Sequence, residues 1–150
     1  MTKDRNGTEP STGRCARGEI MNDEQAVRTG PSLVSVVDDD ESVRESLPDL
    51  LRQFGFAAHT FSSAEAFLGS EFVTRTSCLI LDIAMPGMSG LDLQRELTRR
   101  RQGIPIVFIT AQGDANIRSH VLEKGAVECL FKPFSERALL DALTAALRPR

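Results

Sequence analysis

Residues 78–87 read Cys-Leu-Ile-Leu-Asp-Ile-Ala-Met-Pro-Gly. Four consecutive apolar residues lead into a single carboxylate, Asp82, and the chain soon reaches the turn-forming pair Pro86 and Gly87. A short apolar run that ends near turn residues is typical of a strand buried in a parallel sheet. A charge at the end of such a strand is costly unless chemistry or a metal uses it, and ligands bind outside the carboxyl ends of parallel strands. Asp82 is therefore a candidate functional residue.

Three other apolar runs also end at polar side chains. Aspartates follow the run 33–37, a threonine follows 106–109, and a lysine follows 129–131. Because the carboxyl ends of parallel strands meet at one edge of a sheet, we expect these side chains to form one site with Asp82. The residues at these three strand ends are Asp38, Asp39, Asp40, Thr110, Lys132 and Pro133.

Short apolar runs alternate with segments of helical periodicity from Leu33 onward, which predicts βα units around a parallel sheet. The predicted fold is α/β: a doubly wound five-stranded parallel sheet with five helices and flavodoxin-like strand order. Pro48 is expected to kink the first helix, because its ring removes one backbone donor. The predicted strands are 33–37, 56–61, 78–82, 105–109 and 127–131, and the predicted helices are 41–53, 64–69, 90–101, 115–124 and 135–147.

The composition excludes several classes of protein. A chain of 150 residues is long enough for one domain with its own core. Its three cysteines form no C-x-x-C pair, so neither a disulfide framework nor a zinc site is predicted, and a reducing cytoplasmic location is the simpler expectation. No stretch approaches the roughly 18 consecutive apolar residues of a membrane span. A formal net charge of -3 without a basic face predicts no direct binding to nucleic acid.

Residues 1–31 differ in composition from the rest of the chain. They contain no phenylalanine, and their acidic and basic side chains cancel. Such a segment buries too little apolar surface to offset the entropy of ordering, so it is predicted to be disordered. Met21 is a second candidate start, and the sequence leaves open whether the first 20 residues are translated. The folded domain is expected to span residues 32–148.

Four segments together resemble the receiver domain of bacterial two-component response regulators, over about Leu33 to Leu147. Each segment alone is a weak signal, but all four in this order and at these spacings are highly specific. Residues 63–68 and 125–127 further resemble the FixJ-like subgroup, in which the receiver usually precedes a DNA-binding domain. The four segments are Val36–Glu41, Leu81–Gly90, Phe108–Thr110 and Phe131–Phe134.

The acidic residues at the sheet edge predict a metal site. Asp38, Asp39 and Asp82 would repel one another, and either protonation or a cation must relieve that repulsion. Oxygen ligands suit Mg²⁺, which takes one or two carboxylates, phosphate oxygens and waters. The resemblance implies that the backbone carbonyl of Ala84 is the remaining protein ligand. The alternative interpretation is a solvated acidic loop.

The same edge carries the residues expected to handle a phosphoryl group. Asp82 is the candidate nucleophile, because a carboxylate can accept a phosphoryl group as an acyl phosphate. Lys132 would neutralise charge on the transferring oxygens. Thr110 could hydrogen-bond to one of them, although alone it also fits an ordinary strand end. The resemblance implies a cis peptide between Lys132 and Pro133.

Cys129 departs from the family pattern. The family usually places Tyr or Phe three residues before the lysine, where rotation of the ring reports phosphorylation to the output face. A cysteine cannot provide that rotation. A small apolar strand residue is the favoured interpretation of Cys129 over a redox sensor.

The resemblance implies a function in a phosphorelay. The chain would accept a phosphoryl group from a sensor histidine kinase or a phosphotransfer protein and would catalyse only its own phosphorylation and dephosphorylation. It would then act on an unidentified downstream protein, with no contact to nucleic acid or membrane. A homodimer through the fourth helix, fifth strand and fifth helix is also implied. The chain ends at 147–150, directly after the last helix, which favours a receiver without an output domain.

The sequence also admits two other functions. The chain could be the truncated receiver of a DNA-binding transcriptional regulator, in which case the reading frame would continue into a helix-turn-helix segment. An enzyme fits less well. A haloacid-dehalogenase-like phosphatase needs a second acid two residues after its nucleophile, where this chain has Ala84. A flavin-binding protein of similar fold needs a phosphate-binding loop where this chain has three aspartates.

Deletion of residues 1–31 tests the proposed domain boundary. The truncated protein should keep the melting temperature and the phosphorylation rate of the full chain, because the deleted segment has no apolar periodicity with which to pack on a core. Thermal unfolding followed by circular dichroism checks the first expectation. A large fall in melting temperature would show instead that the segment packs.

Overall fold

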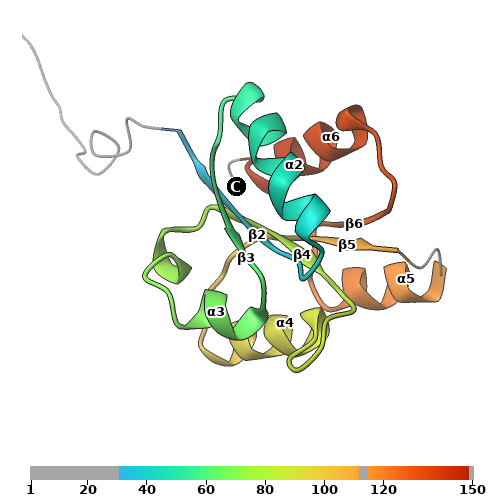
Figure 1. The fold of residues 1–150 in the computed structure, drawn as a ribbon. Helices are drawn as coiled ribbons and strands as arrows, with labels where there is room; N and C mark the ends of the chain where they lie inside the picture. The colour runs from blue at the N-terminus through green and yellow to red at the C-terminus, as the bar shows by residue number, and fades with distance from the viewer. Residues whose placement is uncertain (1–30, 112–114, 149–150) are drawn as a thin grey trace, which may run out of the picture. The chain divides into compact units, whose positions relative to one another are not determined.

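A computed structural model describes residues 31–111 and 115–148 of the chain, in which strands and helices alternate (Figure 1). The predictions about residues 1–31 therefore lie outside the described residues, apart from Pro31. The strands are β2 (Leu33–Val37), β3 (Ala57–Phe61), β4 (Cys78–Asp82), β5 (Ile106–Thr110) and β6 (Glu128–Phe131). The helices are α2 (Glu41–Gln53), α3 (Ala64–Leu68), α4 (Gly90–Arg99), α5 (Ala115–Glu123), α6 (Glu136–Ala146) and the short 3₁₀ helix η2 (Val73–Arg75).

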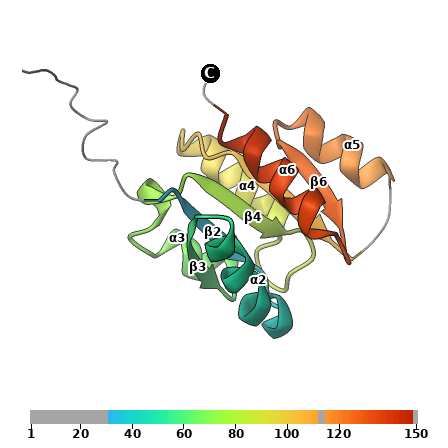
Figure 2. The same cartoon turned by 90° about the horizontal axis from the view of Figure 1, so that it is seen from above.

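The strands form one five-stranded sheet in the order β3-β2-β4-β5-β6, and every neighbouring pair is parallel. The chain moves outward from β2 to β3 and then crosses back to β4, so the winding direction reverses between β2 and β4. Helices α2 and α6 cover one face of the sheet, and α3, α4 and α5 cover the other (Figure 1). Figure 2 shows the same layers from above, with α2 and α6 in front of the strands. The predicted α/β fold with flavodoxin-like strand order is confirmed.

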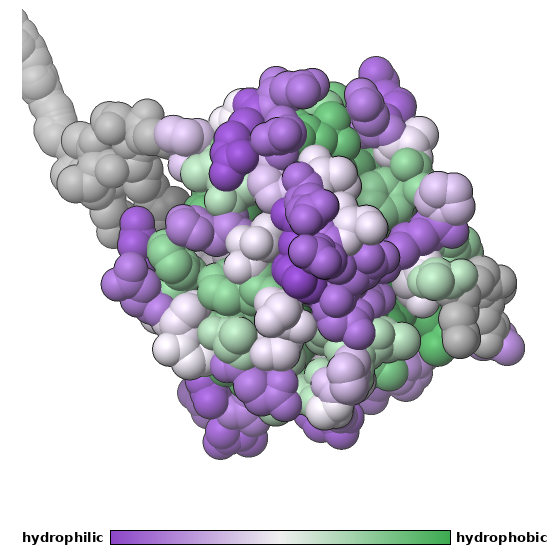
Figure 3. Space-filling view, viewed as in Figure 1, coloured by the Kyte–Doolittle hydropathy of each residue, from purple (hydrophilic) through white to green (hydrophobic). Residues whose placement is uncertain are grey.

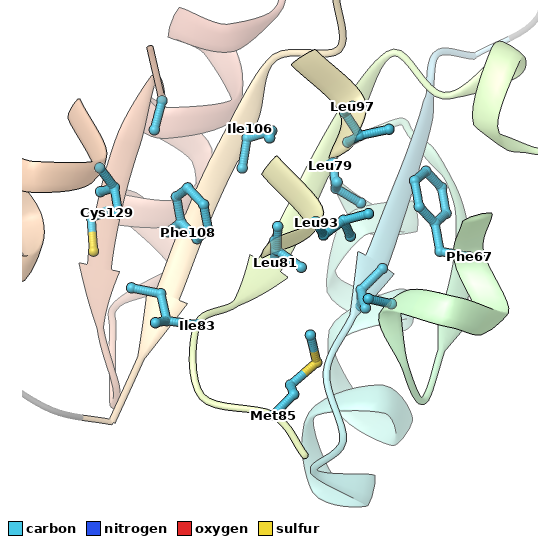
Figure 4. Packing of buried hydrophobic residues seen from close by; sticks show 14 of the residues in the cluster. Phe67, Leu79, Leu81, Ile83, Met85, Leu93, Leu97, Ile106, Phe108 and Cys129 are labelled. Carbon is cyan, nitrogen blue, oxygen red and sulfur yellow. The ribbon is translucent and has the colours of Figure 1, made fainter. Parts of the chain in front are cut away.

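Two hydrophobic cores lie on the two faces of the sheet. Strand β4 is buried along its whole length and supplies both of them, because successive side chains of a strand point to opposite faces. Leu79 and Leu81 pack with α3, α4 and α5, whereas Cys78 and Ile80 pack with α2 and α6. The first of these cores contains Phe67 and Phe108, both fully buried (Figure 4). Burial on both faces explains why β4 reads as a continuous apolar run.

The predicted bounds of β2, β4 and α2 match the observed ones, and the other predicted elements differ by one or two residues at one or both ends. Helix α4 ends at Arg99 rather than at residue 101, because Arg101 adopts a left-handed conformation with φ of 60° and the Gln102 N–H donates to the Leu97 carbonyl. Helix α2 spans Glu41–Gln53 as predicted and contains Pro48. The 3₁₀ helix η2 was not predicted, since three residues are too few to show a period.

The helices in the described part of the chain are short. The longest of them, α2, has 13 residues. A transmembrane helix needs about 20 predominantly apolar residues. None of these described helices has the length and apolar character to cross a membrane.

Candidate functional site

The polar strand ends named above meet at one edge of the sheet. Asp38 directly follows β2, Asp82 ends β4, Thr110 ends β5 and Lys132 directly follows β6. The first three side chains are almost completely buried, with relative exposures of 0%, 5% and 2%. Figure 3 shows hydrophilic side chains gathered over the N-terminal end of α2, which begins beside this edge. The site is therefore a set of buried polar groups under an exposed polar rim.

Three carboxylates come close enough to share one cation. One oxygen from each of Asp38, Asp39 and Asp82 lies within 4.8 Å of the others, and Asp39 is exposed to solvent. Mg²⁺ prefers hard oxygen ligands and keeps part of its water shell. A cluster with two buried carboxylates and one exposed carboxylate fits such an ion, because the exposed side leaves room for water and phosphate oxygens.

Hydrogen bonds fix the position of the Asp38 carboxylate. Its Oδ1 accepts the Asp40 N–H at 2.9 Å, and its Oδ2 accepts a hydrogen bond from Lys132 Nζ at 2.9 Å. The Asp38 N–H donates to the Phe61 carbonyl at 3.1 Å, and Arg44 Nη1 donates to the Asp38 carbonyl at 2.9 Å. Both carboxylate oxygens and both backbone groups of this buried residue therefore have partners.

Burial and then the negative charge of Asp38 together raise the pKa of Asp82 to about 7, against the opposing charge of Lys132. The charged form of Asp82 is thus disfavoured in the folded protein unless a cation is present. Burial by itself lowers the pKa of Lys132, but the hydrogen bond to Asp38 and the charges of Asp82, Asp38 and Asp40 outweigh it and raise that pKa. Lys132 therefore carries its positive charge at neutral pH.

The loop after Asp82 passes close to α4. A Cβ atom on Gly90 would lie 2.3 Å from the Asp82 carbonyl oxygen, so only glycine fits there. The Gly90 N–H donates to the Ile83 carbonyl at 2.9 Å. Ser89 caps α4 and forms a reciprocal capping box with Asp92. Ala84 lies in this loop with its side chain exposed, and its role as a carbonyl ligand stays a prediction.

Strand β5 is joined to the Lys132 turn through the backbone. The Lys132 N–H donates to the Thr110 carbonyl at 2.7 Å, directly after the pair Thr110 and Phe131 that closes the β5–β6 ladder. The peptide bond between Lys132 and Pro133 is cis, as the resemblance implied. Thr110 is 2% exposed at the end of its strand, beside the exposed Ala111.

Cys129 lies in the core rather than on the surface. It is 3% exposed and packs in the same cluster as Phe108 and Ile83 (Figure 4). Burial raises the pKa of its thiol, and the neighbouring Glu128 charge adds to that effect, so the reactive thiolate is disfavoured. Glu128 accepts hydrogen bonds from Arg118 Nη2 at 2.6 Å and from the Cys129 N–H at 2.9 Å. These features support the interpretation of Cys129 as a small core residue.

Two polar residues near the site were not predicted to act there. Arg44 reaches the Asp38 carbonyl from the first turns of α2, and Glu65 accepts the Met88 N–H at 3.1 Å from α3. In the sequence analysis, Glu65 appears only within the subgroup pattern at 63–68. Its contact joins residues 23 positions apart, and no local pattern reports such a pair.

The comparison with known proteins identifies the family. Residues 34–144 match the response regulator receiver domain. The chain belongs to this family. Nodulation protein W of Bradyrhizobium diazoefficiens is 47% identical over 115 residues, which cover 77% of this chain and 51% of that protein. The transcriptional regulatory protein FixJ of Rhizobium meliloti is 39% identical over 113 residues, which cover 75% of this chain and 55% of that protein.

Solved structures agree with this assignment. The crystal structure of FixJ-N superposes with a TM-score of 0.71 at 36% identity, covering 79% of this receiver and 95% of that chain. A low-resolution structure of the response regulator StyR gives a TM-score of 0.73 at 50% identity, covering 79% of this receiver and 60% of that chain. The predicted FixJ-like subgroup is confirmed. The chain spans about half the length of the curated relatives it matches.

The raised pKa of Asp82 predicts an effect on stability. Because the folded state holds the Asp82 proton up to a higher pH than the unfolded state, the free energy of unfolding should fall as pH rises from about 4 to about 7. Asp82→Asn removes the buried charge, so in chelator at pH 8 it should raise the free energy of unfolding by roughly 1–4 kcal/mol. Urea unfolding of the parent and of Asp82→Asn at pH 4 and pH 8 measures both of these changes in the free energy of unfolding.

The control for this stability effect is Asp49→Asn, which removes one exposed carboxylate of α2. It should leave the free energy of unfolding nearly unchanged at both pH values. Added Mg²⁺ should reduce the difference in the free energy of unfolding between the parent and Asp82→Asn. If Asp82→Asn is less stable than the parent at pH 8, the charge of Asp82 does not destabilise the folded state.

Proposed function

We propose that this receiver accepts a phosphoryl group from a phospho-histidine of a sensor kinase or a phosphotransfer protein onto Asp82. The receiver would span residues 32–148, around the matched segment 34–144. The observation that carries the proposal is the buried Asp82 carboxylate, whose pKa is raised by its surroundings and which lies within 4.8 Å of two further carboxylates. Perturbed carboxylates of this kind are concentrated at functional sites.

The reaction is a transfer between two nucleophiles. A carboxylate oxygen of Asp82 attacks the phosphorus atom, and a P–O bond forms while the P–N bond to the donor imidazole breaks with its electron pair returning to nitrogen. The product is an acyl phosphate on Asp82, which water later hydrolyses to phosphate and the free carboxylate. In this proposal the receiver catalyses only these two steps on itself.

Charge compensation by Lys132 is the main contribution of the protein to this transfer. The Lys132 ammonium is anchored on Asp38 at 2.9 Å and interacts electrostatically with Asp82, so it is placed to neutralise oxygens of the incoming group. Thr110, at the neighbouring strand end, would hydrogen-bond to another of these oxygens. Preorganised charge of this kind supplies most of the catalysis in phosphoryl transfer.

A divalent cation completes the site in this proposal. Asp38, Asp39, Asp82 and the Ala84 carbonyl would hold Mg²⁺, and the bound ion would offset the negative charge of both the carboxylates and the phosphoryl group. The three carboxylates support this assignment, because their repulsion is compensated only in part by the single Lys132 ammonium.

The phosphorylated receiver would act through contacts with another protein in the cytoplasm. The surface formed by α5, β6 and α6 is the proposed face for a downstream target or for a second copy of the chain. It carries the exposed ion pair between Arg118 and Glu128. Thr110 ends β5, which is the neighbour of β6 in the sheet. A shift of the Thr110 hydroxyl toward the phosphoryl group would therefore change the packing next to β6.

A second candidate is the receiver part of a DNA-binding transcriptional regulator. The observation that favours it is the length of the relatives, of which this chain spans about half, together with the name of FixJ as a transcriptional regulatory protein. The phosphoacceptor chemistry would be the same in both cases. Reading the gene beyond residue 150 separates them, because only the second predicts a helix-turn-helix segment in frame.

Phosphorylation of Asp82 can be tested by intact mass. Incubation with acetyl phosphate and Mg²⁺ should add one phosphoryl group to the parent and none to Asp82→Asn, because an amide is not an anionic nucleophile. Excess chelator should abolish the gain, and Asp39→Ala should require a higher Mg²⁺ concentration than the parent. An Asn variant that gains the same mass under the same conditions would assign the phosphoryl group to another residue.

Compared with the aromatic residue that is usual at this position, Cys129 should weaken the change that phosphorylation causes in the α5, β6 and α6 surface. It should not slow phosphorylation itself. A ligand shifts a two-state equilibrium only through contacts that differ between the states, and a thiol offers less differential packing than a ring. Cys129→Phe should therefore enlarge the amide shift changes on this surface when a phosphoryl mimic is added.

The matched control at this position is Cys129→Val, which fills the site without supplying a ring and should behave like the parent. Overpacking by the phenylalanine can cost about 1–3 kcal/mol, so melting temperatures of both variants are recorded first. If the mimic changes the amide shifts of the parent as much as those of Cys129→Phe, Cys129 does not weaken the response of this surface.

A further inference from the structure

The loop between Asp82 and α4 is held firmly at both of its ends. At the start, the Ile83 N–H donates to the Ile109 carbonyl at 3.2 Å and the Ile83 carbonyl accepts from Gly90 at 2.9 Å. At the end, Ser89 is fixed by its reciprocal hydrogen bonds with Asp92. The middle of the loop, residues 84–88, contains Ala84, whose carbonyl is the proposed cation ligand.

The middle of the loop has a single polar anchor. Among the residues that the structure describes, segment 84–88 makes one hydrogen bond, from the Met88 N–H to Glu65 Oε2 at 3.1 Å. The only side chain of this segment that is buried is Met85, which packs in the core (Figure 4). An apolar side chain fixes the depth of a loop but does not orient its peptide groups.

The backbone of Glu65 is held in place by its helix, α3. It follows the Ser63 cap of α3, whose Oγ accepts the Ala66 N–H at 3.0 Å, and its helix is anchored by Ala64 and Phe67, both fully buried. The carboxylate of Glu65 is solvent-exposed except where the loop covers it. The hydrogen bond that the Met88 N–H donates to this carboxylate ties the loop to α3.

The loop also approaches Glu65 at a glycine. Gly87 has a φ of +74°, and a Cβ atom at this position would lie 3.1 Å from Glu65 Oε2. A side chain there would be strained by the backbone and crowded by the carboxylate. Gly87 thus allows the backbone to pass directly over Glu65, next to the hydrogen bond from Met88.

We infer that Glu65 is a positioning residue for the cation site, which it serves by anchoring the Met88 N–H and so holding the Ala84 carbonyl in place for Mg²⁺. This inference rests on the proposed function for the identity of the cation. Glu65 contacts neither the metal nor the phosphoryl group. It acts by reducing the number of conformations that the loop must give up when the ion binds.

Two conservative substitutions separate this tether from a simple effect of charge. Glu65→Gln keeps the length and an acceptor oxygen but removes the charge, whereas Glu65→Asp keeps the charge but shortens the side chain by one methylene. A tether predicts that Gln behaves like the parent and that Asp behaves like Ala. A long-range electrostatic effect on the cation predicts the reverse.

The first measurement is the Mg²⁺ dissociation constant of the full chain, obtained by isothermal titration calorimetry because the protein contains no Trp or Tyr. Glu65→Ala and Glu65→Asp should weaken Mg²⁺ binding by about 3- to 10-fold, in line with loss of one hydrogen bond, and Glu65→Gln by less than about 2-fold. Glu123→Ala, which removes an exposed glutamate at the end of α5, is the control and should leave the affinity unchanged. The Met88 amide resonance should move upfield in the Ala and Asp variants, which reports the broken contact directly.

The second measurement separates failure of this inference from failure of the proposed function. With acetyl phosphate, Glu65→Ala should need more Mg²⁺ for half-maximal phosphorylation but should reach the maximal rate of the parent. A parent that is not phosphorylated would overturn the proposed function, and the Mg²⁺ affinities would still test the tether. Equal affinities of Glu65→Ala and the parent, or a Gln variant as weak as the Ala variant, would overturn the tether.

Discussion

The contact on which the site depends is the one between the Lys132 ammonium and the fully buried carboxylate of Asp38, at 2.9 Å. It joins residues 94 positions apart and links the ends of β2 and β6 across the two strands that lie between them. An ionised carboxylate without a partner could not remain in this position, because the cost of removing it from water is several kcal/mol. Since the pair satisfies Asp38, the excess negative charge of the cluster falls on Asp82 and Asp39, at the point where a cation and a phosphoryl group would bind.

The fold holds this charge in place with backbone contacts that leave little freedom. Gly90 passes so close to the Asp82 carbonyl that a Cβ atom would lie 2.3 Å from it, and the Lys132 N–H is bonded to the Thr110 carbonyl. The loop after Asp82 is less constrained in its middle, where Glu65 provides its polar anchor. In the proposed function, the fixed position of Asp82 and the anchoring of the loop by Glu65 would together keep the nucleophile and the Ala84 carbonyl in place for the ion and the phosphoryl group.

The sequence was sufficient to predict the strand-end residues, because each of Asp38, Asp82, Thr110 and Lys132 stands at the end of an apolar run and parallel strands bring such ends together. The five-stranded fold followed from the same alternation and from the family resemblance. The contacts of Glu65 and Arg44 could not be predicted, since they depend on how a side chain reaches across the fold rather than on any period in the chain. The early end of α4 was missed for a related reason: a left-handed Arg101 leaves no signature in the residue pattern.

In the proposed function, Asp82 is the phosphoryl acceptor of a cation site shared with Asp38 and Asp39. A crystal structure of the chain with Mg²⁺ and beryllium fluoride, a mimic of the phosphoryl group, tests it most directly. This assignment of Asp82 requires the mimic on a carboxylate oxygen of Asp82, the cation among the three carboxylates and the Ala84 carbonyl, and Lys132 in contact with a fluorine. A mimic bound to another residue, or a cation bound away from Asp82, would contradict it.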